Sequence, residues 1–212
     1  MSDIASQTKS IKMIFQNYYE VPKYQRDYVW DDELAINLLT NLMEGSRNSI
    51  ENYFIGAIVL QEKDENTYYI VDGQQRLSTL FLIFIALNHK LKSLNSESLI
   101  DEVIIKKTGT IYGEITKFFR IRYNFTKTNE LVKNIYENRH IDNHSSGSKR
   151  TEMFVEAYKQ LEVEINRYFT TSTDLNKFYY FLLNKVHCLP FIAKTEQEAL
   201  RVFDILNSKG VD

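Results

Sequence analysis

Hydrophobic positions follow a strand period and then a helix period on either side of one short turn. Residues 53–61 read Y-F-I-G-A-I-V-L-Q and residues 67–71 read T-Y-Y-I-V, with the polar stretch 63–66 between them. Two apolar runs joined by a polar turn predict a β-hairpin. From residue 75 to about residue 94 the chain is apolar nearly all round, which predicts a helix buried at the centre of the fold. The hairpin therefore leads directly into a central helix.

Shorter patterns predict further elements at both ends of the chain. They are a helix ending near Phe15, a strand at 18–21 stopped by Pro22, a helix that acidic residues open at 31–33 and Gly45 ends, a late strand at 188–193 and a last helix at 197–206. Residues 96–186 have mainly helical patterns, with a possible strand at 119–123 and a polar loop at 138–150. The expected fold is α+β, with a core from residues 1–95 together with 187–212 and a largely helical subdomain at 96–186.

Composition narrows the class of protein. The 212 residues carry a net charge of −2, which argues against a strongly basic nucleic-acid coat but is compatible with local basic patches. The single cysteine, Cys188, excludes an intramolecular disulfide and a cysteine-rich metal site. The polar N-terminus lacks the apolar segment of a signal peptide, and the longest apolar run, 80–87, is too short to span a bilayer. We expect a soluble, cytoplasmic protein without a membrane partner.

The junction between hairpin and central helix is the best candidate for chemistry. It reads Asp72, Gly73, Gln74, Gln75, Arg76. A glycine at a strand-to-helix turn allows close approach of a ligand, and the first N–H groups of the helix form an anion site. A cation in the first turn opposes the helix dipole unless an anion compensates it, which suggests a phosphate. The spacing of Asp72 and Gln75 equally fits a capping box with Asp72 as N-cap, and both interpretations remain open.

A second informative segment is V-P-K-Y-Q-R-D-Y-V-W at 21–30. Gln25 and Arg26 supply planar, multidentate donors suited to phosphates or base edges, and Tyr24 lies beside them. The alternative is an aromatic clamp between strand and helix, with Arg26 paired to a nearby acid.

A third segment follows the last predicted helix and reads Asn207, Ser208, Lys209, Gly210. These residues fit an ordinary helix C-cap, and they equally fit a loop that closes over a nucleotide.

Basic and aromatic residues interleave between Lys117 and Lys127. The mixture suits contact with a nucleic-acid backbone and stacked bases, or a strand with one solvated face. His187 and Pro190 match an H-x-x-P pattern of some His-Asn-His-type nucleases, but no second histidine or asparagine lies at a suitable distance, so we expect no nuclease active site in this chain.

Four blocks in order resemble one known family. They are the segments 21–30, 53–60 (Y-F-I-G-A-I-V-L), 70–80 (I-V-D-G-Q-Q-R-L-S-T-L) and 203–210 (F-D-I-L-N-S-K-G). Together they resemble the N-terminal domain, formerly a domain of unknown function, of the GmrSD-type, modification-dependent (type IV) restriction enzymes. That domain is similar in turn to the ParB and sulfiredoxin superfamily, whose fold is a small mixed sheet with helices.

The resemblance implies a site and a function. Gly73 and Arg76 would contact phosphate, while Asp72, Gln74 and Gln75 would position metal, water or the nucleotide, with Asp72 as the protein ligand of Mg²⁺. Where sulfiredoxin-like members place a reactive cysteine after the glycine, this chain has Gln74.

Members of the family are implied to bind and hydrolyse a nucleoside triphosphate and to couple this to a His-Asn-His-type nuclease module that cuts modified DNA in phage defence. We expect that nuclease domain to be absent from this chain and to be a fused or separate partner. The alternative is a DNA-binding module that senses the modification without catalysis.

Overall fold

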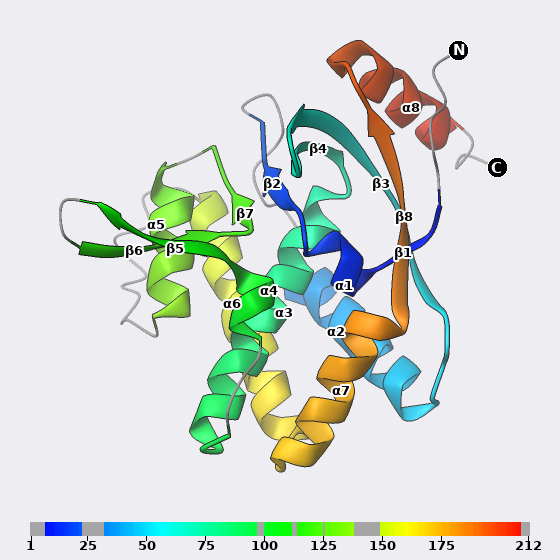
Figure 1. Cartoon of the computed structure of the whole chain (residues 1–212). Coiled ribbons are helices and arrows are strands. Elements are labelled where there is room, and N and C mark those ends of the chain that lie inside the picture. The colour runs from blue at the N-terminus through cyan, green and yellow to red at the C-terminus, as the bar shows by residue number, and fades with distance from the viewer. Residues whose placement is uncertain are drawn as a thin grey trace.

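The computed structural model describes residues 7–22, 32–96, 100–111, 114–124, 126–137 and 149–208. Within these ranges the chain is an α+β protein, as predicted, with a curled sheet beside a group of helices (Figure 1). The resemblance to the ParB and sulfiredoxin folds stays a prediction. None of the described helices is long and apolar enough to cross a membrane.

The main sheet has six strands in the order β1-β8-β3-β4-β2-β7, and β5 pairs with β6 in a separate two-stranded sheet. The strands are β1 (Lys9–Ser10), β2 (Tyr18–Glu20), β3 (Tyr53–Asp64), β4 (Thr67–Asp72), β5 (Ile105–Ile111), β6 (Glu114–Phe119), β7 (Ile121–Arg122) and β8 (Val186–Ala193). The predicted hairpin is confirmed, because β3 and β4 pair antiparallel. Strand β8 runs parallel to β3, and β2 runs parallel to both β4 and β7.

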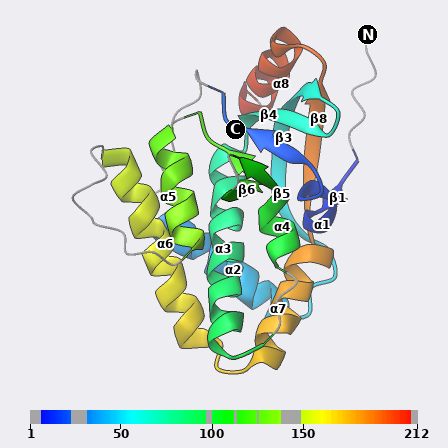
Figure 2. The ribbon, with the colours of Figure 1, turned by 60° about the vertical axis from the view of Figure 1, so that its left-hand side comes forward.

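The helices are α1 (Ile11–Ile14), α2 (Asp32–Arg47), α3 (Gln74–Ser93), α4 (Asp101–Ile104), α5 (Thr126–Tyr136), α6 (Lys149–Tyr168), α7 (Ser172–Asn184) and α8 (Glu196–Ser208). Figure 2 shows α3 near the middle of the helical part, with α5 and α6 to one side and α7 to the other. Side chains of α3 are buried from Leu77 through Asn88. The prediction of a central buried helix is therefore confirmed.

The two faces of the main sheet are covered by different helices. Ile58 and Leu60 of β3 belong to the large core formed with α1, α2, α3, α6 and α7. Their neighbour Val59 instead belongs to a small cluster with Val71 and the apolar face of α8. This follows from the strand geometry, in which successive side chains point to opposite faces. The C-terminal helix therefore packs on the strand pair that leads into α3.

The turn between β4 and α3 is packed tightly against β3. Gly73 has φ +84, in the left-handed region that favours glycine. A Cβ at this position would lie 2.5 Å from Cγ2 of Ile58, so a side chain has no room. The backbone conformation and the close approach together require glycine, and they hold the first turn of α3 in place.

One expectation along the chain was wrong, and one hairpin was not predicted. Helix α2 continues through Gly45 to Arg47, because Gly45 is the position on which the rings of Tyr53 and Phe181 pack: a Cβ there would lie 2.6 Å from Tyr53. The segment after residue 96 was expected to be mainly helical, but residues 105–119 contain the β5–β6 hairpin. The possible strand at 119–123 is interrupted at Arg120, whose guanidinium donates to the carbonyl oxygens of Glu102 and Gln16.

The proposed division into a core and a helical subdomain stays a prediction. One hydrophobic cluster contains side chains from both parts, such as Phe84 of α3 and Phe154 and Leu161 of α6. The predicted loop at 138–150 lies mostly outside the described residues, which resume with α6.

A polar network ties α3 to α6. His89 Nδ1 lies 2.7 Å from the Tyr158 hydroxyl, which donates to Glu162 Oε1 at 2.8 Å. His89, 3.8 Å from the carboxylate, lowers the pKa of Glu162 more than burial raises it, and the Tyr158 hydrogen bond lowers it further. The charged form of Glu162 therefore stabilises the contact between these helices.

We predict that Glu162→Gln reduces the free energy of unfolding at neutral pH by up to about 1 kcal/mol, since part of the side chain is solvated. A lowered pKa in the folded state contributes stability above the unfolded value, near 4.5, and loses it as pH falls through the folded value. The difference between variant and wild type should therefore shrink between about pH 5 and pH 3 in urea unfolding. Glu156→Gln, on the exposed side of α6, is the charge-matched control. A difference that stays constant with pH would contradict the assignment.

We also predict that Gly73→Ala lowers stability by about 2–3 kcal/mol, because it combines positive φ with the contact to Ile58. The control is Asn95→Ala, at an exposed residue with φ 52, which imposes backbone strain alone and should cost about 1 kcal/mol. Equal losses in denaturant unfolding would show that the contact with Ile58 contributes nothing.

Candidate functional site

The candidate site begins where β4 becomes α3. Asp72 is still in the β ladder, opposite Val59, and Gly73 is the N-cap of the helix. The predicted capping box with Asp72 as N-cap is therefore wrong, because Asp72 is held one residue further out by strand pairing. The first bond within the helix runs from the N–H of Leu77 to the carbonyl of Gly73. The N–H groups that precede Leu77 in the first turn lie too early in the helix to find an acceptor within α3.

Gln74 is the most unusual polar side chain of the turn. It is only 5% exposed, and its Nε2 atom has no hydrogen-bond partner among the described residues. An unsatisfied buried amide costs about 1–3 kcal/mol. Such a group at the start of a helix points to a missing acceptor.

Arg76 lies across β3 rather than pointing into open solvent. Its Nη1 donates to the carbonyl oxygen of Ala57 at 2.8 Å. The guanidinium lies over Gly56, where a Cβ would come within 3.2 Å of three of its atoms. Gly56 has φ +100 and lies beside the shift in register between β3 and β8, so the strand bends to accept the arginine.

The charge of Arg76 is not neutralised by a carboxylate in the part of the chain that the structure describes. The first turn of α3 contains no acidic residue. A cation there opposes the positive end of the helix dipole at a cost of about 0.3–1 kcal/mol. An anion near the guanidinium and the helix N-terminus would offset this cost.

Cys188 lies close to the same arginine, but its buried thiol is unreactive. Burial raises the pKa of its thiol to about 12, and the charges of Arg76 and Lys9 oppose this only in part. A neutral, buried thiol is a poor nucleophile. Gln74 follows Gly73 where sulfiredoxin-like members have a reactive cysteine, and the buried Cys188 does not replace it.

Helix α8 packs near the turn, and strand β2 leads toward the same end of the sheet. Leu206 of α8 packs on the cluster that contains Val71, next to Asp72. Asn207 and Ser208 follow it and are exposed, and the hydroxyl of Ser208 donates to the carbonyl of Ile205. Strand β2 runs parallel to β4, so its carboxyl end leads toward the sheet end that carries Asp72. The remaining predicted site residues, Tyr24, Gln25, Arg26, Lys209 and Gly210, lie outside the described residues.

A metal site made by the protein alone is not found in the described residues: no three histidine, cysteine, aspartate or glutamate side chains there are grouped to hold an ion. Asp72 is half-buried at the turn and is its only carboxylate. A single carboxylate suits a Mg²⁺ ion whose other ligands are phosphate oxygens and water.

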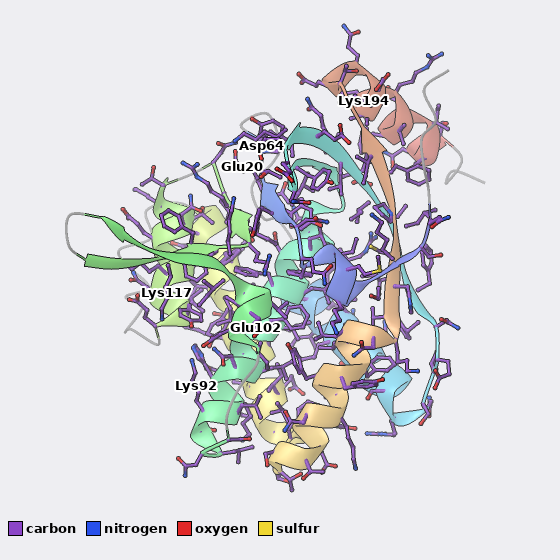
Figure 3. The ribbon with its side chains drawn as sticks, viewed as in Figure 1. Glu20, Asp64, Lys92, Glu102, Lys117 and Lys194 are labelled. Carbon is purple, nitrogen blue, oxygen red and sulfur yellow. The ribbon has the colours of Figure 1, made fainter. Side chains whose placement is uncertain are left out.

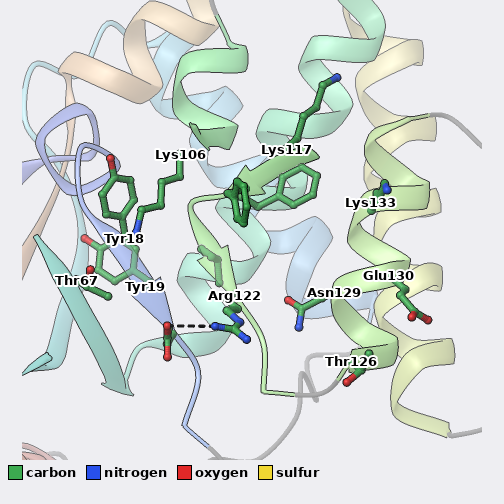
Figure 4. Close-up of a pocket in the computed structure, with 14 residues that line it drawn as sticks. Tyr18, Tyr19, Thr67, Lys106, Lys117, Arg122, Thr126, Asn129, Glu130 and Lys133 are labelled. Atoms are coloured by element: carbon green, nitrogen blue, oxygen red, sulfur yellow. Dashed lines mark ion pairs between the residues drawn. The ribbon is translucent and has the colours of Figure 1, made fainter. Parts of the chain in front are cut away.

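A second feature, of which the sequence indicated only part, is a cleft of about 510 Å³ beside strands β2 and β7 at one edge of the main sheet (Figure 4). Lys117, Phe118, Phe119 and Arg122 of the interleaved segment line it. Its other cations, Lys106 and Lys133, come from β5 and α5. No local pattern linked these two lysines to the interleaved segment. The unpredicted β5–β6 hairpin places Lys106 in the cleft, and α5 carries Lys133 into its lining.

Comparison with known proteins supports one family. A search of curated proteins finds no match. The family profile described as GmrSD restriction endonuclease, N-terminal domain, matches residues 8–212, which is nearly the whole chain. Because this match covers far more than half of the chain, the chain belongs to the family of GmrSD restriction endonuclease N-terminal domains.

Proposed function

We propose that the β4–α3 turn binds the phosphates of a nucleoside triphosphate, and that this chain is the NTP-hydrolysing regulatory module of a GmrSD-like restriction system. The observation that carries the proposal is the buried, unpartnered amide of Gln74 at a helix start that also holds Arg76 without a carboxylate partner in the described residues. Both groups are donors: the Gln74 amide has no acceptor among the described residues, and Arg76 has the carbonyl of Ala57 but no carboxylate there. A phosphate supplies several acceptor oxygens and negative charge at one point.

Each residue of the turn has a distinct proposed role. Gly73 lets the backbone approach the phosphate, and Arg76 offsets its charge from the side of β3. Gln74 and Gln75 bind the nucleotide and orient the attacking water. Asp72 would be the protein ligand of Mg²⁺, which when bound neutralises charge on the triphosphate.

The walls of the site would come from both ends of the chain. Strand β2 leads toward this end of the sheet, and α8 packs beside it. We assign contacts with the nucleotide to Tyr24, Gln25 and Arg26 after β2, and to Asn207 and Ser208 at the end of α8 with Lys209 and Gly210 after it.

Cleavage of modified phage DNA belongs, in this proposal, to a His-Asn-His-type nuclease module that is fused or separate. The family profile is named for a restriction endonuclease, and this is what links the chain to DNA restriction. Nucleotide binding and hydrolysis then regulate that nuclease.

We predict that Arg76→Ala weakens triphosphate binding at least about tenfold, because it removes a charge-assisted hydrogen bond to phosphate of about 1.5–3 kcal/mol. Asp72→Ala should retain more binding and lose phosphate release. The measurement is binding and phosphate release with GTP, ATP, CTP and UTP, each with Mg²⁺. The controls are Arg167→Ala, on the exposed side of α6, and Asp64→Ala, near the opposite end of the hairpin. Equal behaviour of wild type and all four variants would reject the site.

Gln74→Met separates function from structure at the turn. If the amide exists for a ligand, replacing it with an apolar side chain of similar length removes an unsatisfied buried group. We therefore predict that the variant without nucleotide is as stable as wild type, or more stable by about 1 kcal/mol, in thermal unfolding. Added nucleotide should raise its Tm less than that of wild type. A destabilised variant with an unchanged nucleotide response would show that Gln74 serves the fold.

A further inference from the structure

We propose that the cleft beside β2 binds a single strand of nucleic acid, with phosphates on its lysines and a base against its aromatic wall. Figure 4 shows the residues that line the cleft, which come from β2, β7 and the start of β4 in the main sheet and from β5, β6 and α5 beside it. Its volume of about 510 Å³ is enough for a nucleotide unit and water.

The lining of the cleft is positive although the chain as a whole carries a net charge of −2. Four cations line it against two acids: Lys106, Lys117, Arg122 and Lys133, with Glu20 and Glu130. Glu20 is already engaged, since its carboxylate lies 2.8 Å from Lys63 and 3.8 Å from Arg122. Positive charge on the cleft therefore exceeds what its own carboxylates neutralise.

Two of the lysines are held by tyrosine rings instead of carboxylates. The Nζ atom of Lys106 lies 3.8 Å from the ring centroid of Tyr18, and that of Lys117 lies 4.6 Å from the centroid of Tyr136. Neither lysine forms an ion pair within the described residues. A cation–π contact positions an ammonium group while leaving its charge available to an anion. Within the described part of the chain, these lysines are therefore positioned donors without a carboxylate acceptor.

The aromatic wall gives the cleft a preference for flat ligands. Phe118 and Phe119 are half-buried in it. Phe119 is anchored edge-on by Phe81, at 6.3 Å between centroids, and by Tyr136, at 5.4 Å. Alternating cations and aromatic rings match the alternation of phosphate and base along a strand. An acidic peptide would satisfy the lysines but would leave the rings unused.

The cleft is a separate site from the β4–α3 turn. Thr67, at the start of β4, lines the cleft, whereas Asp72, at its end, begins the turn. Five residue steps along an extended strand are about 17 Å, so the cleft and the turn do not share lining residues.

The test is the binding of a fluorescein-labelled oligothymidylate of about 12 nucleotides to the whole chain, followed by anisotropy across a salt series. Lys117→Ala/Lys133→Ala should weaken binding at least about tenfold at low salt and reduce the salt slope by about 1.4, or 0.7 for each phosphate that is no longer neutralised. The control is Lys177→Ala/Lys194→Ala, which removes the same charge from exposed sites; Figure 3 shows Lys194 at the far end of the molecule from Lys117. Matching thermal unfolding of both variants verifies that they fold.

An abasic oligonucleotide of the same length tests the aromatic part. We expect it to bind at least about fivefold more weakly than oligothymidylate, since stacking contributes about 1–3 kcal/mol for each base. Equal loss of affinity in the cleft and control variants would overturn the proposal, because the effect would then reflect net charge. Equal binding of abasic and thymidylate strands would also overturn it, since the cleft would then accept any polyanion. Failure of either kind leaves the nucleotide assays on Arg76 and Asp72 unaffected.

Discussion

The structure depends on the close contact between Gly73 and Ile58, at the point where the central helix leaves the sheet. A helix as apolar as α3 must be buried along almost its whole length, so its start cannot move without moving the core around it. The glycine allows the helix to begin directly against β3, without a connecting loop. The N-terminal N–H groups of α3 are thereby fixed at the end of a strand, where a ligand can reach backbone donors that do not need to rearrange.

The same contact explains why the polar groups around it do not make the capping hydrogen bonds that are usual at the start of a helix. Strand pairing retains Asp72, so it does not occupy the N-cap, and the residue that does has no side chain. Arg76 is directed over the bend at Gly56, and Gln74 is enclosed by the packing. The lack of a side-chain cap, the arginine in the first turn and the Gln74 amide, unpartnered among the described residues, each lower local stability, a cost that the proposed ligand would offset. The polar network of His89, Tyr158 and Glu162, toward the other end of α3, differs in that its hydrogen bonds are made within the protein.

Strand β4 connects the two regions to which we assign ligands. Its end leads into the turn, and its start lines the basic cleft. Nucleotide and nucleic acid would therefore bind at opposite ends of one rigid element. In these two proposals, β4 would physically connect the bound nucleotide with the bound nucleic-acid strand.

The hairpin, the central helix and the C-terminal helix followed from the sequence, because local period and burial agree in those segments and one alternation of apolar residues is enough to assign each face. The position of the strand-to-helix turn was also readable, since a glycine between a strand and a helix has few structural alternatives. Only the tertiary structure decided that Gly73 and not Asp72 is the N-cap, that Gly45 lies within a helix, and that Lys106, Lys117 and Lys133 share a cleft. Each of these depends on contacts between residues far apart in the chain, such as Gly73 with Ile58 and Gly45 with Phe181, and no local pattern records such contacts.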